Sequence, residues 1–197
     1  MAAGSATRSR TPLSRQRIVT AALTGVEARG SAELSLRSLA RDLGVTAPAI
    51  YDHFDGKADV LQAVAAEGYR AMDAAFVVEG ARAIDRCRRR ALAYVAFAQD
   101  RPELFRVMFL YRPAAVAMDA DNELPAANDT FETGLADIAQ AIVDGDLVER
   151  DPVQINFTLW AAIHGVATIG LMAPALADLV VDDVVDAMFR GLRPDGS

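Results

Sequence analysis

Apolar residues in the first third of the chain recur with the spacing of short amphipathic helices. Between residues 36 and 43 they stand at positions i, i+3, i+4 and i+7, which form one face of a helix. Gly44 follows, and glycine readily takes the positive φ at which helices end. Thr46 stands where its hydroxyl can cap a second helix, which carries Ile50 and Phe54 on its apolar side. This spacing predicts a helix-turn-helix, whose second helix lies in the DNA major groove.

Helical periodicity continues along the rest of the chain. No β-branched alternating run of strand length occurs, so we predict an all-α fold of about nine helices. The second helix of the helix-turn-helix should end after two turns, at Asp55-Gly56, and residues 111–128 should form a loop rich in Pro and acidic residues. The other helices are predicted over residues 14–28, 57–77, 81–98, 102 onward, 129–143, 152–172 and 180–192.

Two of these helices have distinctive faces. Four arginines of the helix over residues 81–98 are expected to form a solvated face, namely Arg82, Arg86, Arg89 and Arg90. The helix over residues 152–172 is apolar around most of its circumference and must be covered on every side. A second copy of the chain would cover what the other helices leave open, which predicts a homodimer. Gly165 and Gly170 would let helices approach closely there.

The runs LARDLGV, AIYDHF and GKADVL resemble the DNA-binding domain of the TetR family of one-component transcriptional regulators. FAQDRPELFRVMF and LWAAIHGVATIGL resemble a C-terminal domain of the same family that is named for its Trp-His-Gly motif, here Trp160, His164 and Gly165. The resemblance implies a helix-turn-helix domain over residues 14–70 and an effector-binding and dimerisation domain over residues 71–197. It also implies that the last two helices form the homodimer. Residues 1–13 are small, polar and basic and are expected to be a flexible arm, or else a plain solvated tail.

DNA contacts are expected along the helix-turn-helix. The resemblance implies that Tyr51 and His53 contact phosphates, although a capping or packing role for His53 remains open. Lys57 is expected to contact phosphate too, because it opens a helix whose free N–H groups face an anion. Residues at the start of the second helix should meet base edges or the backbone, and Arg37 on the first helix is a further candidate. The complete set is Ser35, Arg37, Thr46, Ala47, Pro48, Tyr51, His53 and Lys57.

A set of large apolar or amphipathic residues in the second domain is the candidate effector pocket. Their helical spacing also fits an ordinary packed core, so both interpretations stay open. Aromatic rings and methionines would suit a flat hydrophobic ligand. His164 would hydrogen-bond that ligand or, the slightly favoured alternative, a backbone carbonyl. The set is Met72, Phe76, Phe105, Met108, Phe109, Phe131, Trp160 and His164.

Charge and cysteine content constrain the class of protein. Residues 1–57 hold eight basic and five acidic residues, a net of +3, and residues 58–197 hold twelve and twenty-two, a net of −10, which together give the net charge of −7. Positive charge is needed only where phosphates are met.

The one cysteine, Cys87, agrees with a reducing compartment, and neighbouring arginines are able to lower its pKa, although an inert cysteine is the expected case. With no export signal and no uninterrupted apolar run of about 20 residues, a cytoplasmic protein without membrane partners is predicted.

These observations favour a regulator over an enzyme. The sequence holds two histidines far apart and no HExxH, CxxC, GxSxG or phosphate-binding glycine loop, so no catalytic residue, metal or cofactor is expected. We predict a homodimeric repressor released from a palindromic DNA operator by a small hydrophobic ligand. The alternative is a helical protein-interaction adaptor of the same fold with weak or lost DNA binding. Asp52, and the lack of Arg, Asn or Gln on the second helix to read bases, motivate that alternative.

Overall fold

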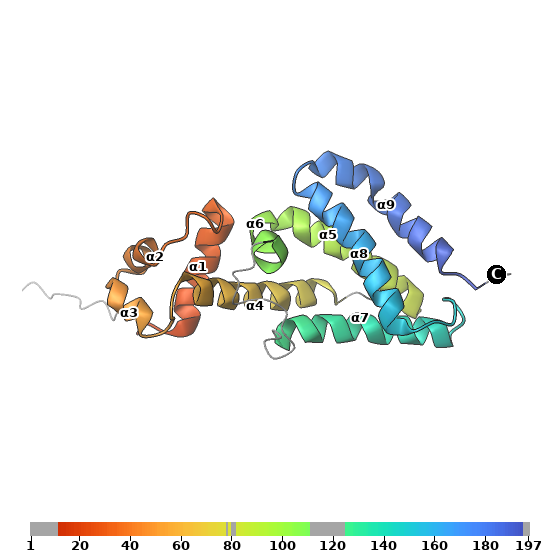
Figure 1. The fold of residues 1–197 in the computed structure, drawn as a ribbon, viewed down its shortest axis with the longest axis horizontal. Helices are drawn as coiled ribbons and strands as arrows, with labels where there is room; N and C mark the ends of the chain where they lie inside the picture. Colours follow the sequence, from red (N-terminus) through yellow and green to blue (C-terminus); the bar gives the residue numbers. More distant parts are fainter. Residues whose placement is uncertain (1–11, 78, 80–81, 111–124, 195–197) are drawn as a thin grey trace, which may run out of the picture. The chain divides into compact units, whose positions relative to one another are not determined.

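The computed structural model describes residues 12–77, 79, 82–110 and 125–194, and every regular element within these ranges is a helix (Figure 1). This confirms the all-α prediction. The elements are α1 (Arg15–Arg29), α2 (Leu36–Leu43), α3 (Ala47–Tyr51), α4 (Lys57–Ala75), α5 (Ala83–Asp100), α6 (Pro102–Phe105), the π-helix η1 (Arg106–Leu110), α7 (Pro125–Val143), α8 (Pro152–Gly170) and α9 (Pro174–Gly191). The predicted basic arm and most of the predicted loop over residues 111–128 lie outside the described residues.

The chain forms two compact units, Met1–Leu61 and Gln62–Ser197. The boundary between the units falls within α4, whose first residues belong to the first unit and whose remaining residues belong to the second. The helix continues across the boundary because its sequence has no helix-breaking residue there. The domain boundary predicted after residue 70 falls inside this helix, and the functional extent of each domain stays a prediction.

The first unit is built from α1, α2, α3 and the start of α4 around a small apolar core. Ser14 caps α1 and Ser35 caps α2, each accepting a hydrogen bond from a backbone N–H three residues on. Gly44 ends α2 with a φ of 69°, as its position in the sequence predicted. The core side chains, each no more than 4 % exposed, include Ile18, Ala22, Val26, Leu39, Ile50, Phe54 and Val60.

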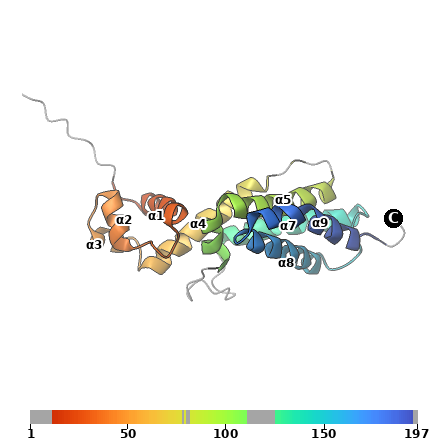
Figure 2. The same ribbon diagram turned by 90° about the horizontal axis from the view of Figure 1, so that it is seen from above.

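The second unit is a bundle in which α5, α7, α8 and α9 lie side by side in both ribbon views (Figures 1 and 2). Helix α5 contacts each of the other three, so it is the centre of the bundle. Leu104, Phe105 and Met108, from α6 and η1, are almost completely buried in this unit. Burying several such large apolar side chains, at roughly 1.5–3 kcal/mol each, is the main stabilising contribution here.

Several predicted helix boundaries were wrong. Helix α3 ends at Tyr51 instead of running to Asp55-Gly56, because the chain turns at once, with the His53 N–H bonded to the Ile50 carbonyl. Thr46 is the N-cap residue of α3, but its side chain makes no capping hydrogen bond.

The helices of the second unit also begin or change earlier than predicted. Proline opens α7 at Pro125 and α9 at Pro174, several residues before the predicted starts, since its fixed φ suits the first turn of a helix. Residues 125–128, predicted as loop, are therefore helical. The helix predicted from residue 102 onward is α for four residues and then widens into the π-helix η1.

The predicted solvated arginine face of α5 was also wrong in part. Arg86 and Arg90 both pair with Asp137 of α7, each at 2.8 Å, and the Arg90 side chain is only 13 % exposed. Arg82 pairs with Asp146. Acidic partners on other segments draw these side chains toward the bundle, because a buried charge is tolerated only beside its opposite. Gly170 approaches Ala177 as expected, whereas nothing in the described residues lies against Gly165.

Candidate DNA-binding surface and aromatic cluster

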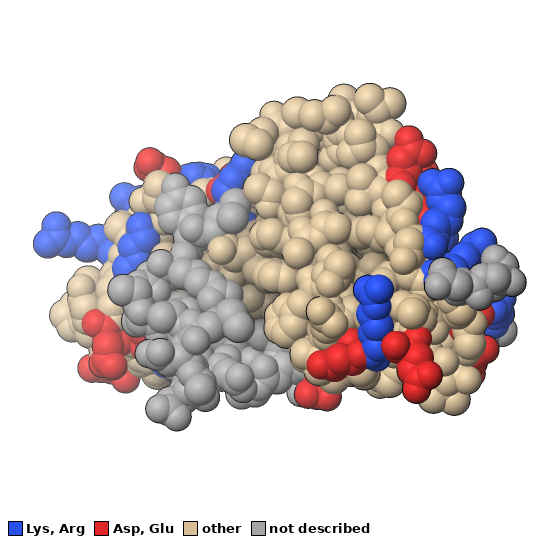
Figure 3. Space-filling view, turned by 45° about the vertical axis from the view of Figure 1, so that its right-hand side comes forward, with Lys and Arg blue, Asp and Glu red and all other residues tan. Residues whose placement is uncertain are grey.

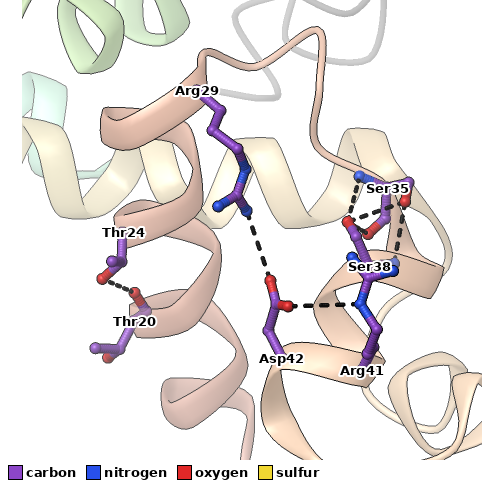
Figure 4. A network of polar contacts seen from close by, with 7 residues as sticks. All are labelled: Thr20, Thr24, Arg29, Ser35, Ser38, Arg41 and Asp42. Atoms are coloured by element: carbon purple, nitrogen blue, oxygen red, sulfur yellow. Dashed lines mark hydrogen bonds and ion pairs between the residues drawn. The ribbon is translucent and has the colours of Figure 1, made fainter.

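The N-terminus of α2 is held by a reciprocal pair of serines. The Ser35 hydroxyl accepts the Ser38 N–H at 3.1 Å, and the Ser38 hydroxyl accepts the Ser35 N–H at 3.3 Å (Figure 4). This arrangement satisfies two N–H groups that a helix start leaves without partners inside the helix. It fixes the end of α2 on which the predicted contact residues Ser35 and Arg37 stand.

A charged group lies beside this helix start. Arg29 of α1 and Arg41 of α2 both approach the carboxylate of Asp42, at 3.5 and 3.9 Å (Figure 4). The side chains border a shallow cavity of about 520 Å³. Its lining residues are Arg29, Glu33, Ser35, Arg37, Ser38, Arg41 and Asp42. Three arginines against two acids give this exposed surface a net positive charge, which suits a phosphate.

The short helix α3 presents small and aromatic side chains to solvent. Pro48 lies in its first turn, and Thr46 and Pro48 are exposed. Tyr51 is 58 % exposed, so its hydroxyl and much of its ring are available at the surface. Ala47 and His53 are half-buried, and Asp52 is exposed. The exposed positions agree with a recognition surface, while Ile50 and Phe54 anchor the helix to the core.

Arg15 joins three elements of the first unit and was not among the predicted site residues. Its guanidinium donates to the His53 carbonyl at 2.6 Å and pairs with Asp59 at 2.9 Å. The same group lies 3.9 Å from the centre of the Phe54 ring, a cation–π contact. Arg15 therefore positions the turn that carries His53 against the start of α4. The carbonyl is 38 residues away in sequence, so no local pattern signals this contact.

Lys57, the single lysine of the chain, donates from its ammonium group to the Ala32 carbonyl at 3.1 Å. This hydrogen bond ties the start of α4 to the segment between α1 and α2. It leaves two of the three ammonium hydrogens for other acceptors. The side chain is thus held in place at a helix start, where an anion is favoured.

The eight predicted effector residues of the second unit fall into two groups. Met72, Phe76, Phe105 and Met108 are buried to 6 % exposure or less, as an ordinary core would be. Phe109, Phe131 and His164 are half-buried, and Trp160 is 41 % exposed.

Four of the eight meet directly. The His164 ring lies 5.6 Å from Phe105, 5.2 Å from Phe109 and 5.0 Å from Trp160. Phe131 instead contacts Phe157 at 5.2 Å.

Tyr94 of α5 is the residue that joins these rings, and it was not among the predicted site residues. Its ring packs against Phe76, Phe105, Phe109 and His164. Its hydroxyl lies 2.7 Å from His164 Nδ1 and accepts the Trp160 indole N–H at 3.3 Å. The favoured partner of His164, a backbone carbonyl, was therefore wrong. We call Tyr94, Phe105, Phe109, Trp160 and His164 the aromatic cluster.

Burial keeps the polar members of the aromatic cluster neutral. It raises the pKa of Tyr94 well above the usual range, with only partial opposition from the hydrogen bond to Trp160. It also lowers the pKa of His164. Both changes favour the uncharged form, since a charge is poorly solvated there.

The part of α4 in the second unit packs closely on η1. A methyl group added at Gly68 would lie 2.6 Å from the Met108 sulfur. The Tyr69 hydroxyl donates to the Met108 carbonyl at 3.4 Å. π-Helical turns are frequent at functional sites. Here the π-helix η1 itself carries Phe109 of the aromatic cluster.

Helices α8 and α9 expose a set of large apolar side chains. One face of the molecule carries a broad uncharged area (Figure 3). Seven large exposed apolar side chains on two adjacent helices and the turn between them are unusual on a chain that works alone. The exposed side chains of the two helices and the turn between them are Val153, Phe157, Trp160, Ile169, Met172, Leu176 and Leu179.

Two further classes of site are not found in the described part of the chain. No helix there is long and apolar enough to cross a membrane. Likewise, none of its His, Cys, Asp and Glu residues gather in a group able to hold a metal ion.

Two family models match the chain. Residues 18–64 match the family of bacterial regulatory proteins named for TetR, and residues 87–192 match the tetracyclin repressor-like C-terminal domain. Two regulators of Pseudomonas putida, the HTH-type transcriptional regulator SrpR and the uncharacterized HTH-type transcriptional regulator TtgW, are each 52 % identical over 52 residues, 26 % of this chain. That segment spans 24 % of the first relative and 39 % of the second.

Solved structures extend the likeness to nearly the whole chain. A protein of unknown function from Rhodococcus sp. RHA1 is 28 % identical, with a TM-score of 0.77 over 95 % of this chain and 100 % of that one. A TetR variant from Acinetobacter baumannii in complex with minocycline is 19 % identical, with a TM-score of 0.67 over 91 % and 96 %. The second likeness shows the fold alone.

The C-terminal model alone covers more than half of the chain, and the N-terminal model covers the helix-turn-helix. The predicted membership is confirmed, and with it the prediction of a regulator in place of an enzyme. The chain belongs to the TetR family and is a DNA-binding transcriptional regulator.

Proposed function

We propose that this regulator is a homodimeric repressor, released from a palindromic operator when a small hydrophobic ligand binds. The observation that carries the ligand response is the half-buried His164 inside the aromatic cluster, beside a Trp160 that is 41 % exposed. A core that served packing alone would bury both. The eight predicted effector residues form the proposed ligand site, with Tyr94 added.

The proposed DNA surface consists of the start of α2, the exposed side of α3 and the start of α4. The exposure of Tyr51, the capped end of α2 at Ser35 and the anchored ammonium of Lys57 support it. The contact set is the predicted one, Ser35, Arg37, Thr46, Ala47, Pro48, Tyr51, His53 and Lys57. Few of these side chains read bases directly, so we propose that DNA shape contributes to specificity.

The proposed dimer forms through α8 and α9. Their exposed apolar side chains other than Trp160, which is left open for the ligand, support it, because a second copy would remove that surface from water. Two copies would present two α3 helices to successive major grooves of a palindrome. DNA binding places the proposed site of action in the cytoplasm, with no membrane partner.

Ligand release requires that the ligand bind the DNA-free form more tightly than the DNA-bound form. Helix α4 is the proposed carrier of the change, because its residues belong to both units. The close packing of Gly68 on Met108 supports this role, since η1 cannot shift there without displacing a neighbour.

The test is a titration of the protein into a labelled duplex from the region upstream of its own gene. It is done at two salt concentrations with unrelated competitor DNA, and then repeated with a library of hydrophobic compounds. Competitor-resistant binding by two chains per duplex, weakened by at least one compound, is the expected result. Binding by single chains would contradict the dimer, and an operator affinity unchanged by every compound would contradict ligand release. If the upstream duplex does not bind, selection from a random-sequence pool identifies the operator first.

A further inference from the structure

The hydrogen bonds of the aromatic cluster have a defined direction. The Trp160 indole N–H can only donate, so the Tyr94 oxygen is its acceptor. Tyr94 is 5 % exposed, and its own hydrogen needs an acceptor. Among the described residues, the acceptor for this hydrogen is His164 Nδ1, at 2.7 Å from the Tyr94 oxygen. If Nδ1 carried the proton instead, a buried hydroxyl hydrogen would stay unsatisfied, which is costly.

This direction places the proton of the neutral imidazole on Nε2. Within the part of the chain that the structure describes, Nε2 has no hydrogen-bond partner. The His164 side chain is half-buried, so this N–H is a donor in a largely apolar setting. The same chain of hydrogen bonds holds the ring in place, which lowers the entropic cost of using it for recognition.

The surroundings of the imidazole define the shape of what it would bind. The Phe105 ring is stacked on His164 with an angle of 28° between planes, and the Phe109 ring meets it edge-on at 69°. Trp160 leaves 41 % of its surface exposed next to the same ring. A flat aromatic body that covered the Trp160 face would gain apolar burial and ring contacts. Phe105, Phe109 and Trp160 carry no charge, and burial disfavours the charged forms of Tyr94 and His164, so an ionic ligand would find no opposite charge in the aromatic cluster.

We propose that the aromatic cluster recognises a neutral, flat aromatic ligand with one hydrogen-bond acceptor, which receives the His164 Nε2–H while the ring system covers Trp160. This inference rests on the proposed ligand response and narrows "small hydrophobic" to one chemical class. Tyr94 acts in it as a positioning residue, because its hydroxyl fixes which nitrogen of His164 carries the proton.

The test compares two probes of nearly equal shape, quinoline and naphthalene. Quinoline offers one ring nitrogen as acceptor, and naphthalene offers none. Both affinities are measured on the full-length protein by equilibrium dialysis. Trp160, the single tryptophan, locates the bound probe through its emission. The ratio of quinoline to naphthalene affinity is compared between variants, because this cancels the difference in how water solvates the two probes.

His164→Phe should lower this affinity ratio by about 2- to 10-fold, the range for one hydrogen bond, while naphthalene still binds. The double variant Tyr94→Phe, His164→Phe removes both partners of the internal hydrogen bond and should give the same lowered ratio with the fold intact. Phe97→Leu is the matched control, since this buried ring of α5 makes no ring contact with the aromatic cluster among the described residues. It should leave the ratio unchanged.

An unchanged ratio in a folded His164 variant would overturn the proposal, as would failure of both probes to bind or to alter Trp160 emission. Release of operator DNA is measured in the same samples. A ratio that responds to His164 without any release of DNA would keep the recognition site and refute ligand release by this class. Release of DNA by other hydrophobic compounds, with no binding of quinoline, would support ligand release and refute the proposed recognition site.

Discussion

The two units place their candidate functional residues in opposite environments. In the first unit they stand on exposed ends of short helices, and polar contacts such as those of Arg15 and Ser35 hold the backbone beneath them. In the second unit most are large apolar side chains that also fill the core. Trp160 is exposed, and Phe109, Phe131 and His164 are half-buried. Substitutions in the first unit should therefore separate binding from stability. In the second unit the same side chain often serves both.

The largest expected effect comes from removing the anchor of the recognition surface. Phe54 is 2 % exposed and lies under the Arg15 guanidinium, so Phe54→Ala should cost about 3–5 kcal/mol. Amide protection over residues 15–61 should fall and DNA binding should be lost. Trp160 emission, which reports on the second unit, should stay native. Hydrogen exchange and fluorescence measure the two units separately.

Tyr51→Ala is the matched control for this variant, because Tyr51 is an exposed aromatic of the same segment. It should weaken DNA binding with amide protection intact. An equal loss of protection in both units of Phe54→Ala would break the distinction between them.

The next effect concerns a charge inside the second unit. Asp137→Asn leaves Arg86 and Arg90 without their shared carboxylate, and Arg90 is only 13 % exposed. Loss of about 3 kcal/mol is expected, since an uncompensated buried charge is costly. Denaturant unfolding followed by Trp160 emission measures it. Asp182→Asn, on the exposed side of α9, should change stability by less than about 0.5 kcal/mol. Equal effects of the two substitutions would mean that the arginines find other partners.

The sequence predicted most of what depends on neighbours along the chain. The i, i+3, i+4, i+7 spacing of α2 and the positive φ of Gly44 are local, and both were predicted correctly. The family motif predicted the helix-turn-helix for the same reason, because the residues of the motif lie close together in sequence. Helix starts at Pro125 and Pro174 were missed because proline was read as a break, whereas it also suits a first turn.

Contacts between distant segments were not predictable in this way. Arg15 meets a carbonyl 38 residues away, Arg86 meets a carboxylate 51 away, and Tyr94 meets His164 70 away. Each pair depends on how helices cross, which periodicity does not encode. The π-helix η1 was not predictable from sequence either. Its local sequence is compatible with an ordinary α-helix, and the packing around Met108 determines which form it takes.

A smaller effect tests the half-buried cation at Lys57 in the first unit. Lys57→Ala removes one charge at the start of α4, so the slope of log affinity against log salt should fall by about 0.9, as for one phosphate contact. Affinity should drop similarly for all sequences, since a phosphate contact carries no base information. Arg193→Ala, in the exposed end of the second unit, should leave the slope unchanged. The same slope in both variants would show that Lys57 serves only its bond to the Ala32 carbonyl.

The smallest expected effect is the slow reaction of the Cys87 thiol in the native protein with a disulfide reagent. Burial raises the pKa of the Cys87 thiol to about 12, with the Asp137 charge adding to it and Arg90 and Arg86 opposing. Below that pH the thiol is protonated, so at pH 8 only about one native molecule in ten thousand carries the reactive thiolate. A disulfide reagent should modify the unfolded chain quickly and the native chain very slowly. The arginines next to Cys87 in sequence do not activate it, because burial is the larger effect.

Because Cys87 is the single cysteine, its reaction rate measures opening of the second unit alone. Phe54→Ala should leave the rate unchanged. Asp137→Asn should raise the reaction rate for two reasons. It makes opening of the second unit more frequent, and it removes the negative charge that disfavours the thiolate. If Phe54→Ala raised the rate as much as Asp137→Asn, damage in the first unit would be opening the second. The two units would then be one cooperative structure, and the exposed and buried candidate sites would share a single stability.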